Sequence, residues 1–247
     1  MEASRTNLVN FLREPKQLIL PDSQSPYDIS DEMQVEFWKN IIRLSTDESV
    51  TEHYLGLFMI LEKGLFCTYQ IPKLILIDGH QRLVTIHLLL AALAKVSGDS
   101  GNGGIEFSRK YVYDNYFTNN NLNKEEEDSD ALYYKLVLSS IDNKIYRKLI
   151  DGNDNVPLPS LHPMVKAFRF FEKAIAESGL SPADIYKGIG KFTVADISTD
   201  RYYENPQYVY ETIMDAKLTL EQAKLLLKWL SGLLSVSCIP VRQAVEK

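Results

Sequence analysis

The spacing of hydrophobic and polar positions predicts alternating strands and helices in the first part of the chain. Apolar residues that recur every three or four positions indicate helices, and runs of β-branched and aromatic residues indicate strands. In chain order, the pattern predicts a helix at 7–13, an extended segment at 17–20, a helix from 31 to 44, a β-hairpin made of 54–61 and 68–77, and an apolar helix at 83–96.

Beyond residue 96 the pattern becomes mainly helical. It predicts a Gly-rich loop at 97–104, a strand at 105–113, an acidic loop at 119–130, helices at 131–150, 161–177, 206–214 and 220–234, and one more strand at 192–197. We therefore expect an α/β (α+β) fold with a small sheet covered by helices. An α/β region at 1–118 and the loop at 119–130 are followed by a mainly helical region at 131–247, which packs on the first region within one domain.

The junction between the second hairpin strand and the apolar helix is the strongest candidate for a binding site. Residues 73–86 read KLILIDGHQRLVTI, which is a buried strand, an Asp-Gly turn and a helix that begins directly afterwards. The free N–H groups in the first turn of a helix, together with its dipole, favour an anion. Gly79 lets a ligand approach the backbone, and Arg82 is a charged fork that suits two phosphate oxygens. Asp78, at the carboxyl end of the strand, suits a metal or a ribose hydroxyl.

Structural roles for the same residues stay open at this point. A strand, an Asp-Gly turn and a helix occur in many proteins that bind no ligand there, and Asp78 then serves only as a helix cap. His87 lies on an otherwise apolar helix, so we expect it to be a core residue rather than a ligand.

Composition and missing motifs exclude several classes of protein. With 247 residues, 45% of them hydrophobic, the chain can bury a large core without needing disulfide bonds or a structural metal to fold. Cys67 and Cys238 have no metal-ligand spacing, so we expect reduced core residues, and no two histidines share the i, i+4 spacing of a helical metal site. The GxxxxGK[ST], GxGxxG and GxSxG motifs are absent from the sequence.

The expected setting is the cytoplasm. The N-terminus has no secretory signal pattern, and the longest apolar helix is too short for a bilayer, so we expect no membrane partner. A net charge of −6 should repel a phosphate backbone, so DNA contact by this chain alone is expected to be weak.

Three sequence motifs carry a family resemblance. Residues 20–29 read LPDSQSPYDI, residues 54–56 and 77–85 read YLG and IDGHQRLVT, and residues 210–220 read YETIMDAKLTL. In that order they resemble I-P-x-x-Q-R-x-Y-x-W, then Y/F-L-G with I-D-G-Q-Q-R-L-T-T, and finally F-E-x-x-N-x-x-G-x-x-L. These are motifs of the amino-terminal domain of GmrSD-type, modification-dependent restriction systems, a branch of the ParB/sulfiredoxin superfamily. The likeness spans about 7–234.

Five positions depart from the family motifs. Ser25, Ile29, His80, Met214 and Lys217 stand where the family has Arg, Trp, Gln, Asn and Gly. The change at Ser25 removes a fixed cation that would help to hold a phosphate or a modified DNA backbone. The change at His80 is milder, because related ParB-like and sulfiredoxin-like proteins also place His within a G-x-x-R turn.

The resemblance implies that 1–118 is a ParB-like nucleotide-binding region. It implies a nucleoside triphosphate (ATP, GTP or CTP) at the D-G-x-x-R turn, with Mg²⁺ and often with hydrolysis. By position, we assign Arg82 and the N–H groups near Gly79 to Gln81 to the phosphates, and Asp78 to Mg²⁺ or to a water molecule. His80 is a candidate phosphate ligand or proton shuttle, because its unperturbed pKa lies near neutrality.

Two residues of the first motif complete the candidate site. Gln24 and Tyr27, on the preceding loop, either approach the same cleft or have structural roles, with Gln24 bonded to backbone and Tyr27 packed in a turn.

The implied function has two forms. In the first, the chain is a metal-assisted NTPase that licenses a partner nuclease in anti-phage defence. No His-rich HNH segment follows residue 220, so the nuclease is either a separate subunit or part of a longer chain, or none is used. In the second, it is a non-catalytic nucleotide sensor or a regulatory module. Direct DNA cleavage is not expected. Self-association stays open, because the hydrophobic helices of the second half must bury against something.

Overall fold

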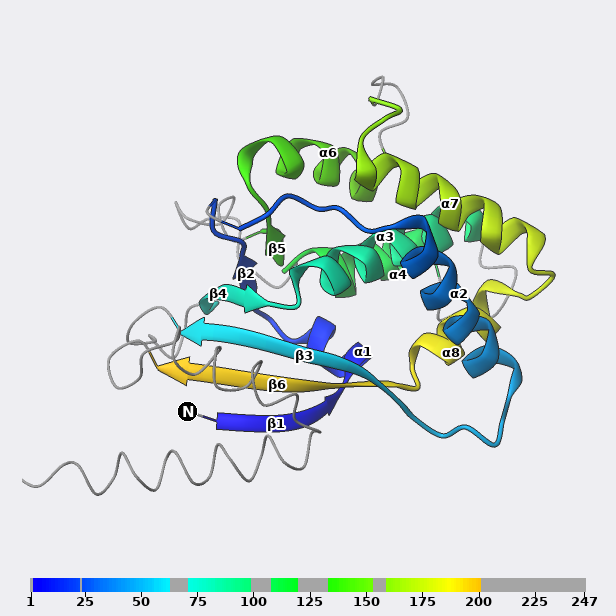
Figure 1. The fold of residues 1–247 in the computed structure, drawn as a ribbon, viewed down its shortest axis with the longest axis horizontal. Coiled ribbons are helices and arrows are strands. Elements are labelled where there is room, and N and C mark those ends of the chain that lie inside the picture. Colours follow the sequence, from blue (N-terminus) through cyan, green and yellow to red (C-terminus); the bar gives the residue numbers. More distant parts are fainter. Residues whose placement is uncertain are drawn as a thin grey trace, which may run out of the picture.

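A computed structural model shows an α/β fold built on a six-stranded mixed sheet (Figure 1). It describes residues 2–22, 24–62, 71–98, 108–119, 133–152 and 159–200. The strands are β1 Glu2–Asn7, β2 Gln17–Ile19, β3 His53–Glu62, β4 Lys73–Asp78, β5 Leu136–Val137 and β6 Phe192–Asp200, in the spatial order β1-β6-β3-β4-β2-β5.

Segments that are far apart in the sequence share this sheet. Strand β6 lies between β1 and β3, antiparallel to β1 and parallel to β3. Strands β3 and β4 are antiparallel, and β2 runs parallel to both β4 and β5. The strand that leads into the candidate turn, β4, is therefore an interior strand with β3 and β2 as neighbours.

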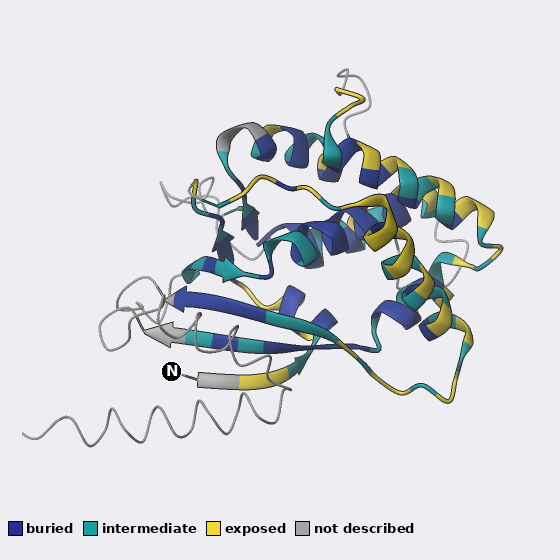
Figure 2. Ribbon diagram, in the orientation of Figure 1, coloured by how far each residue is buried: buried dark blue, intermediate teal, exposed yellow. Residues whose placement is uncertain are grey.

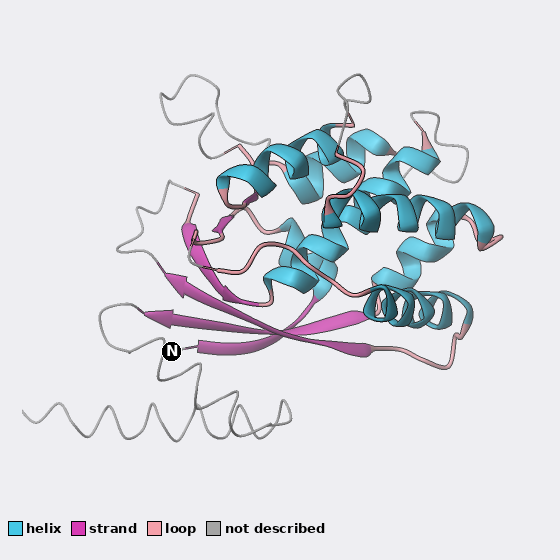
Figure 3. Ribbon diagram, turned by 45° about the horizontal axis from the view of Figure 1, so that its top comes forward, coloured by secondary structure: helices cyan, strands magenta, loops and turns pink. Residues whose placement is uncertain are grey.

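The described helices lie on one side of the sheet (Figures 1 and 3). They are α1 Leu8–Arg13, α2 Asp31–Thr46, α3 His80–Ser97, α4 Arg109–Val112 with the π-helical turn η1 Tyr113–Phe117, α6 Ser140–Asp151, α7 Pro163–Glu177 and α8 Pro182–Ile189. Helix α3 is buried on all sides from Leu83 to Ala94, as expected for a helix that is apolar all round. Figure 2 shows the buried positions along α3, along the second half of β3 and along the first half of β6.

Most of the predicted elements in the described residues are confirmed. The helices expected at 7–13, 31–44, 83–96 and 161–177 are α1, α2, α3 and α7, and the hairpin and the strand at 192–197 are also present. None of the described helices is long and apolar enough to span a membrane.

Two predictions from the pattern are wrong. The described part of the strand expected at 105–113 is helical, because the Ser108 side chain caps α4 by accepting a hydrogen bond from the Tyr111 N–H. This local cap outweighs the β propensity of the aromatic run. The helix expected from 131 begins only at Ser140, because Leu136–Val137 is extended and pairs with β2.

Strand β1 and helix α8 were not predicted. Strand β1 is polar and lies at the edge of the sheet, whereas α8 is started by a capping box between Ser181 and Asp184. The helices predicted at 206–214 and 220–234, the third motif, both cysteines and most of the two predicted loops lie outside the described residues.

Candidate functional site

Gly79 shapes the turn between β4 and α3. It has a φ of +94°, and a Cβ at this position would lie 2.3 Å from Phe58 Cδ1 and 2.8 Å from Leu57 O. Both the backbone conformation and the lack of space therefore require glycine. The N-cap residue of α3 is Gly79 itself, which has no side chain to cap the first turn. The first N–H groups of the helix have no intrahelical acceptor and are available to an anion.

Arg82 lies in this first helical turn with its guanidinium against Gly56 of β3. Its Nη2 donates to Leu57 O at 2.6 Å and lies 3.4 Å from Asp78 Oδ2. Gly56, with a φ of +134°, makes the room, because a Cβ there would lie 2.7 Å from Arg82 Nη1. Among the described residues, the buried Arg82 Nε–H has no hydrogen-bond acceptor. An unpaired buried donor typically costs about 1–3 kcal/mol, so this donor fits an arrangement that a ligand completes.

The loop before α2 folds onto the same turn. Gln24 Nε2 donates to Leu76 O at 2.8 Å and to Ile77 O at 2.9 Å, while its buried Oε1 has no donor within the described chain. Tyr27 is buried, with its hydroxyl 3.0 Å from Thr85 Oγ1. Burial raises the pKa of Tyr27 far above its ordinary value, so the hydroxyl stays protonated.

Gln81 and His80 make the corresponding contacts from the helix. Gln81 Oε1 accepts the Asp28 N–H at 3.1 Å, and Gln81 Nε2 donates to Pro26 O at 3.1 Å. The same amide nitrogen lies 3.0 Å from His80 Nε2, which makes Nε2 the acceptor and leaves the hydrogen on Nδ1. Burial lowers the pKa of His80, and the nearby charge of Asp78 and the Ser25 backbone partly oppose this effect. His80 is therefore a neutral imidazole in a fixed orientation.

Asp78 is the only carboxylate in the D-G-H-Q-R turn. Its Oδ2 faces Arg82, and the side chain is 24% exposed. The described residues contain no cluster of three or more His, Cys, Asp or Glu side chains suited to a metal ion. Mg²⁺ usually keeps several waters and takes one or two carboxylates together with substrate phosphates. Asp78 therefore fits Mg²⁺ as a ligand shared with a phosphate-bearing molecule, and it does not form a metal site alone.

Comparison with known proteins decides the family. Residues 8–231 match the family described as GmrSD restriction endonuclease, N-terminal domain. The chain belongs to this family. No curated protein matches the chain. Membership of the GmrSD family indicates a role in a restriction system.

In this GmrSD domain, the fold brings all the predicted site residues within the described chain into one contact region. The loop contributes Gln24 and Tyr27, and the turn contributes Asp78, Gly79, His80, Gln81 and Arg82. Both loop residues make the structural contacts that the sequence left open. Their part in ligand binding stays a prediction.

The sequence reasoning missed Gly56 and the Leu57 carbonyl. Gly56 belongs to the Y-L-G motif, which gives it no role by itself. The structure gives the reason for this glycine, because a side chain at position 56 would collide with the Arg82 guanidinium that lies against it. The Leu57 carbonyl had no sequence signal, since its backbone reaches Arg82 only through the pairing of β3 with β4.

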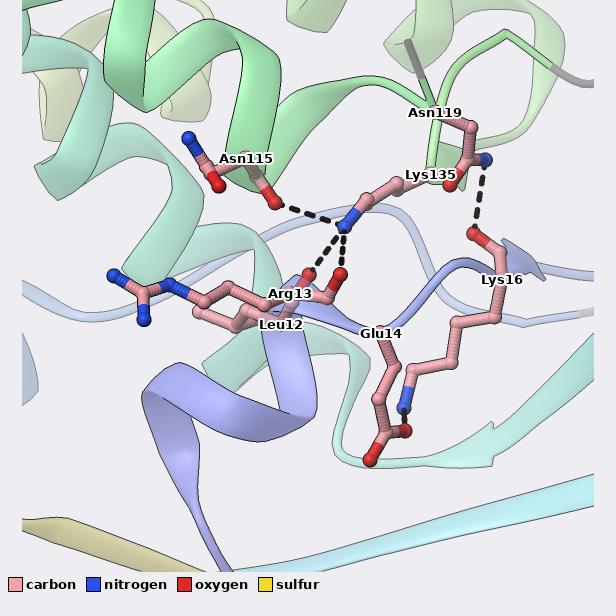
Figure 4. Close-up of polar contacts among 7 residues, drawn as sticks. All are labelled: Leu12, Arg13, Glu14, Lys16, Asn115, Asn119 and Lys135. Carbon is pink, nitrogen blue, oxygen red and sulfur yellow. Dashed lines mark hydrogen bonds and ion pairs between the residues drawn. The ribbon is translucent and has the colours of Figure 1, made fainter. Parts of the chain in front are cut away.

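A second polar region of the GmrSD domain shares no residue with the turn. A hollow of about 300 Å³ is lined by Arg13, Pro15, Ile71, Asp114, Asn115, Thr118, Asn119 and Lys135. Lys135 Nζ donates to Leu12 O at 2.9 Å, Arg13 O at 2.7 Å and Asn115 O at 2.8 Å (Figure 4). These bonds use all three ammonium hydrogens. Lys135 therefore fastens the end of α1 to η1 and has no hydrogen left for a ligand.

Proposed function

We propose that this domain binds a nucleoside triphosphate with Mg²⁺ at the Asp78–Arg82 turn and hydrolyses it to control a partner nuclease. The observation that carries the proposal is the Arg82 guanidinium. It is held against Gly56 beside a helix N-terminus whose N-cap residue is Gly79, with a buried Nε–H that lacks an acceptor among the described residues. A fixed cation next to free N–H groups is the arrangement that suits phosphate oxygens.

The remaining residues have distinct roles in this proposal. Asp78 shares Mg²⁺ with the phosphates, and the ion supplies charge neutralisation during phosphoryl transfer. His80, neutral and oriented, is placed to exchange a proton at Nδ1 or Nε2 when the ligand displaces one of its present partners. Gln24 and Tyr27 hold the loop over the site. Because the chain has a net charge of −6, the proposal leaves most of the DNA contact to the nuclease partner.

A nucleotide sensor that does not hydrolyse its ligand is the second candidate. It is favoured by the contacts of His80 and Tyr27, which engage both imidazole nitrogens and the phenol hydroxyl within the protein. It is also favoured by Ser25, which stands where the family motif has a cation. A sensor needs the phosphate contacts of Arg82 but no group that orients an attacking water.

Calorimetric titration with Mg·ATP, Mg·GTP and Mg·CTP, followed by a phosphate-release assay, tests both candidates. Arg82→Ala should abolish binding of whichever nucleotide binds the wild type, because the fixed cation is lost. Arg43→Ala is the matched control, since Arg43 is an exposed arginine in the last turn of α2. Binding with phosphate release supports the NTPase, and binding without release supports the sensor. Unchanged affinity in Arg82→Ala contradicts the placement of the site.

A further inference from the structure

The buried carboxylate of Asp142 joins the loop that carries Gln24 and Tyr27 (the site loop) to the helical layer. Asp142 lies in the first turn of α6 and is 4% exposed. Its Oδ2 accepts the backbone N–H of Tyr27 at 3.1 Å, and its Oδ1 lies 3.2 Å from His162 Nε2. A buried carboxylate needs donors for its oxygens. Here one donor comes from the site loop and the other from the start of α7.

His162 has a fixed orientation between its two partners. It is the N-cap residue of α7, and its Nδ1 accepts the Met164 N–H at 3.3 Å. Since Nδ1 is an acceptor, the ring hydrogen lies on Nε2 and points at Asp142. The first turns of α6 and α7 are thereby connected through a single carboxylate.

On the other side, the connection continues into α3. Thr85 donates its hydroxyl hydrogen to Gln81 O at 2.7 Å. The Tyr27 hydroxyl must therefore be the donor in its 3.0 Å contact with Thr85 Oγ1. Tyr27 is thus held at its backbone by Asp142 and at its ring end by the first turns of α3. Figure 1 shows the segment between β2 and α2 running between α6 and α3.

We propose that Asp142 and His162 are positioning residues that set the loop carrying Gln24 and Tyr27 against the Asp78–Arg82 turn, and so tune its affinity for phosphate. The inference rests on the proposed nucleotide site. Without the Asp142 carboxylate, the Tyr27 N–H has no acceptor and the loop loses its only described tie to α6. The contacts of Gln81 with Pro26 and Asp28 then remain to hold the loop, together with those of Gln24 and of the Tyr27 hydroxyl.

Three variants separate this role from a general effect on folding. Asp142→Ala removes both contacts. His162→Asn keeps a good N-cap for α7, but the shorter side chain cannot reach Asp142. Asp184→Ala is the matched control, because it removes another carboxylate from the first turn of a helix, in the capping box of α8. Thermal unfolding is measured for each variant, so that lost stability is known separately.

The readouts are backbone hydrogen exchange at Tyr27 and Asp28 and calorimetric affinity for whichever of Mg·ATP, Mg·GTP and Mg·CTP binds the wild type. We expect exchange at both amides to accelerate about tenfold or more in Asp142→Ala, and affinity to fall by roughly tenfold. His162→Asn should show a smaller change in the same direction. Asp184→Ala should lower the unfolding temperature without altering either readout.

The outcomes distinguish this inference from the proposed function. Unchanged exchange at Tyr27 in Asp142→Ala overturns the positioning role, even where the wild type binds nucleotide well. Faster exchange with unchanged affinity also overturns it, since the loop position then has no effect on the site. Absence of nucleotide binding by the wild type overturns the proposed function itself, and the inference falls with it.

Discussion

Replacing Gly56 with alanine should damage both folding and the proposed phosphate site, because Gly56 lies against Arg82. A Cβ at position 56 would lie 2.7 Å from Arg82 Nη1 and 2.9 Å from Cζ, whereas unstrained contacts need about 3.5 Å. The guanidinium must therefore retreat by roughly 0.8 Å. Such a shift can stretch its 2.6 Å bond to Leu57 O beyond the usual range of about 2.7–3.2 Å, and a hydrogen bond to a charged group contributes about 1.5–3 kcal/mol. The φ of +134° adds a backbone cost of about 1–3 kcal/mol for a residue with a side chain.

Urea unfolding and nucleotide titration of Gly56→Ala measure the two effects. We expect the free energy of unfolding to fall by about 3 kcal/mol and the nucleotide affinity to fall at least tenfold, since each tenfold corresponds to about 1.4 kcal/mol. Gly179→Ala is the control for backbone strain alone, because Gly179 has a φ of +69° and a Cβ added there would have no atom within 4 Å. It should lose only about 1 kcal/mol of stability and bind normally.

A double-mutant cycle identifies the clash as the cause. In Arg82→Ala the guanidinium is gone, so adding Gly56→Ala should cost only the backbone strain. A Gly56→Ala cost that is the same with and without the Arg82 side chain would refute the reasoning, because Arg82 supplies the three nearest atoms to the added Cβ.

Two further predictions concern the buried side chains of His87 and Lys135. Burial lowers the pKa of His87 from 6.5 to about 3, so the unfolded chain binds a proton that the folded protein refuses. His87 should therefore leave the free energy of unfolding unchanged above pH 6.5. Below that pH, the free energy of unfolding should fall by about 1.4 kcal/mol per pH unit toward pH 3. Urea unfolding across this range should show a shallower slope for His87→Gln. Lys135→Met should lower the free energy of unfolding by about 3 kcal/mol, because the carbonyls of Leu12, Arg13 and Asn115 lose their shared donor. The exposed control Lys173→Met should leave the urea midpoint unchanged, and an equal effect of both substitutions contradicts a structural role for Lys135.

The sequence predicted the strand, turn and helix of the site because their signals are local. Gly79 and the apolar run after it define the end of β4 and the start of α3 without help from distant segments. The motif likeness also linked the loop at 20–29 to this turn. The pattern alone did not show how they meet, since the bonds of Gln24 to Leu76 O and Ile77 O depend on tertiary placement.

Non-local pairing accounts for the errors. Leu136–Val137 looked helical because apolar residues continue into α6, yet its backbone pairs with β2 instead. Tertiary pairing thus overrode local periodicity. The role of Asp142 was hidden for the same reason: its partners, Tyr27 and His162, come from the site loop and from the start of another helix.

Two residues that depart from the GmrSD motifs, His80 and Ser25, lie close together in the structure. The His80 ring, which replaces a glutamine of the motif, interacts with the backbone of Ser25, which replaces its arginine, and this interaction acts against the lowering of the His80 pKa by burial. Gln81 holds the other ring nitrogen and ties the neighbouring Pro26 and Asp28 to the helix. The imidazole thus fastens the stretch of loop where the motif carries its arginine. Neighbouring changes that make a new contact favour a remodelled site over a decayed one. The Arg82 guanidinium, held against Gly56, agrees with this view and supports the proposed binding of a phosphate-bearing ligand.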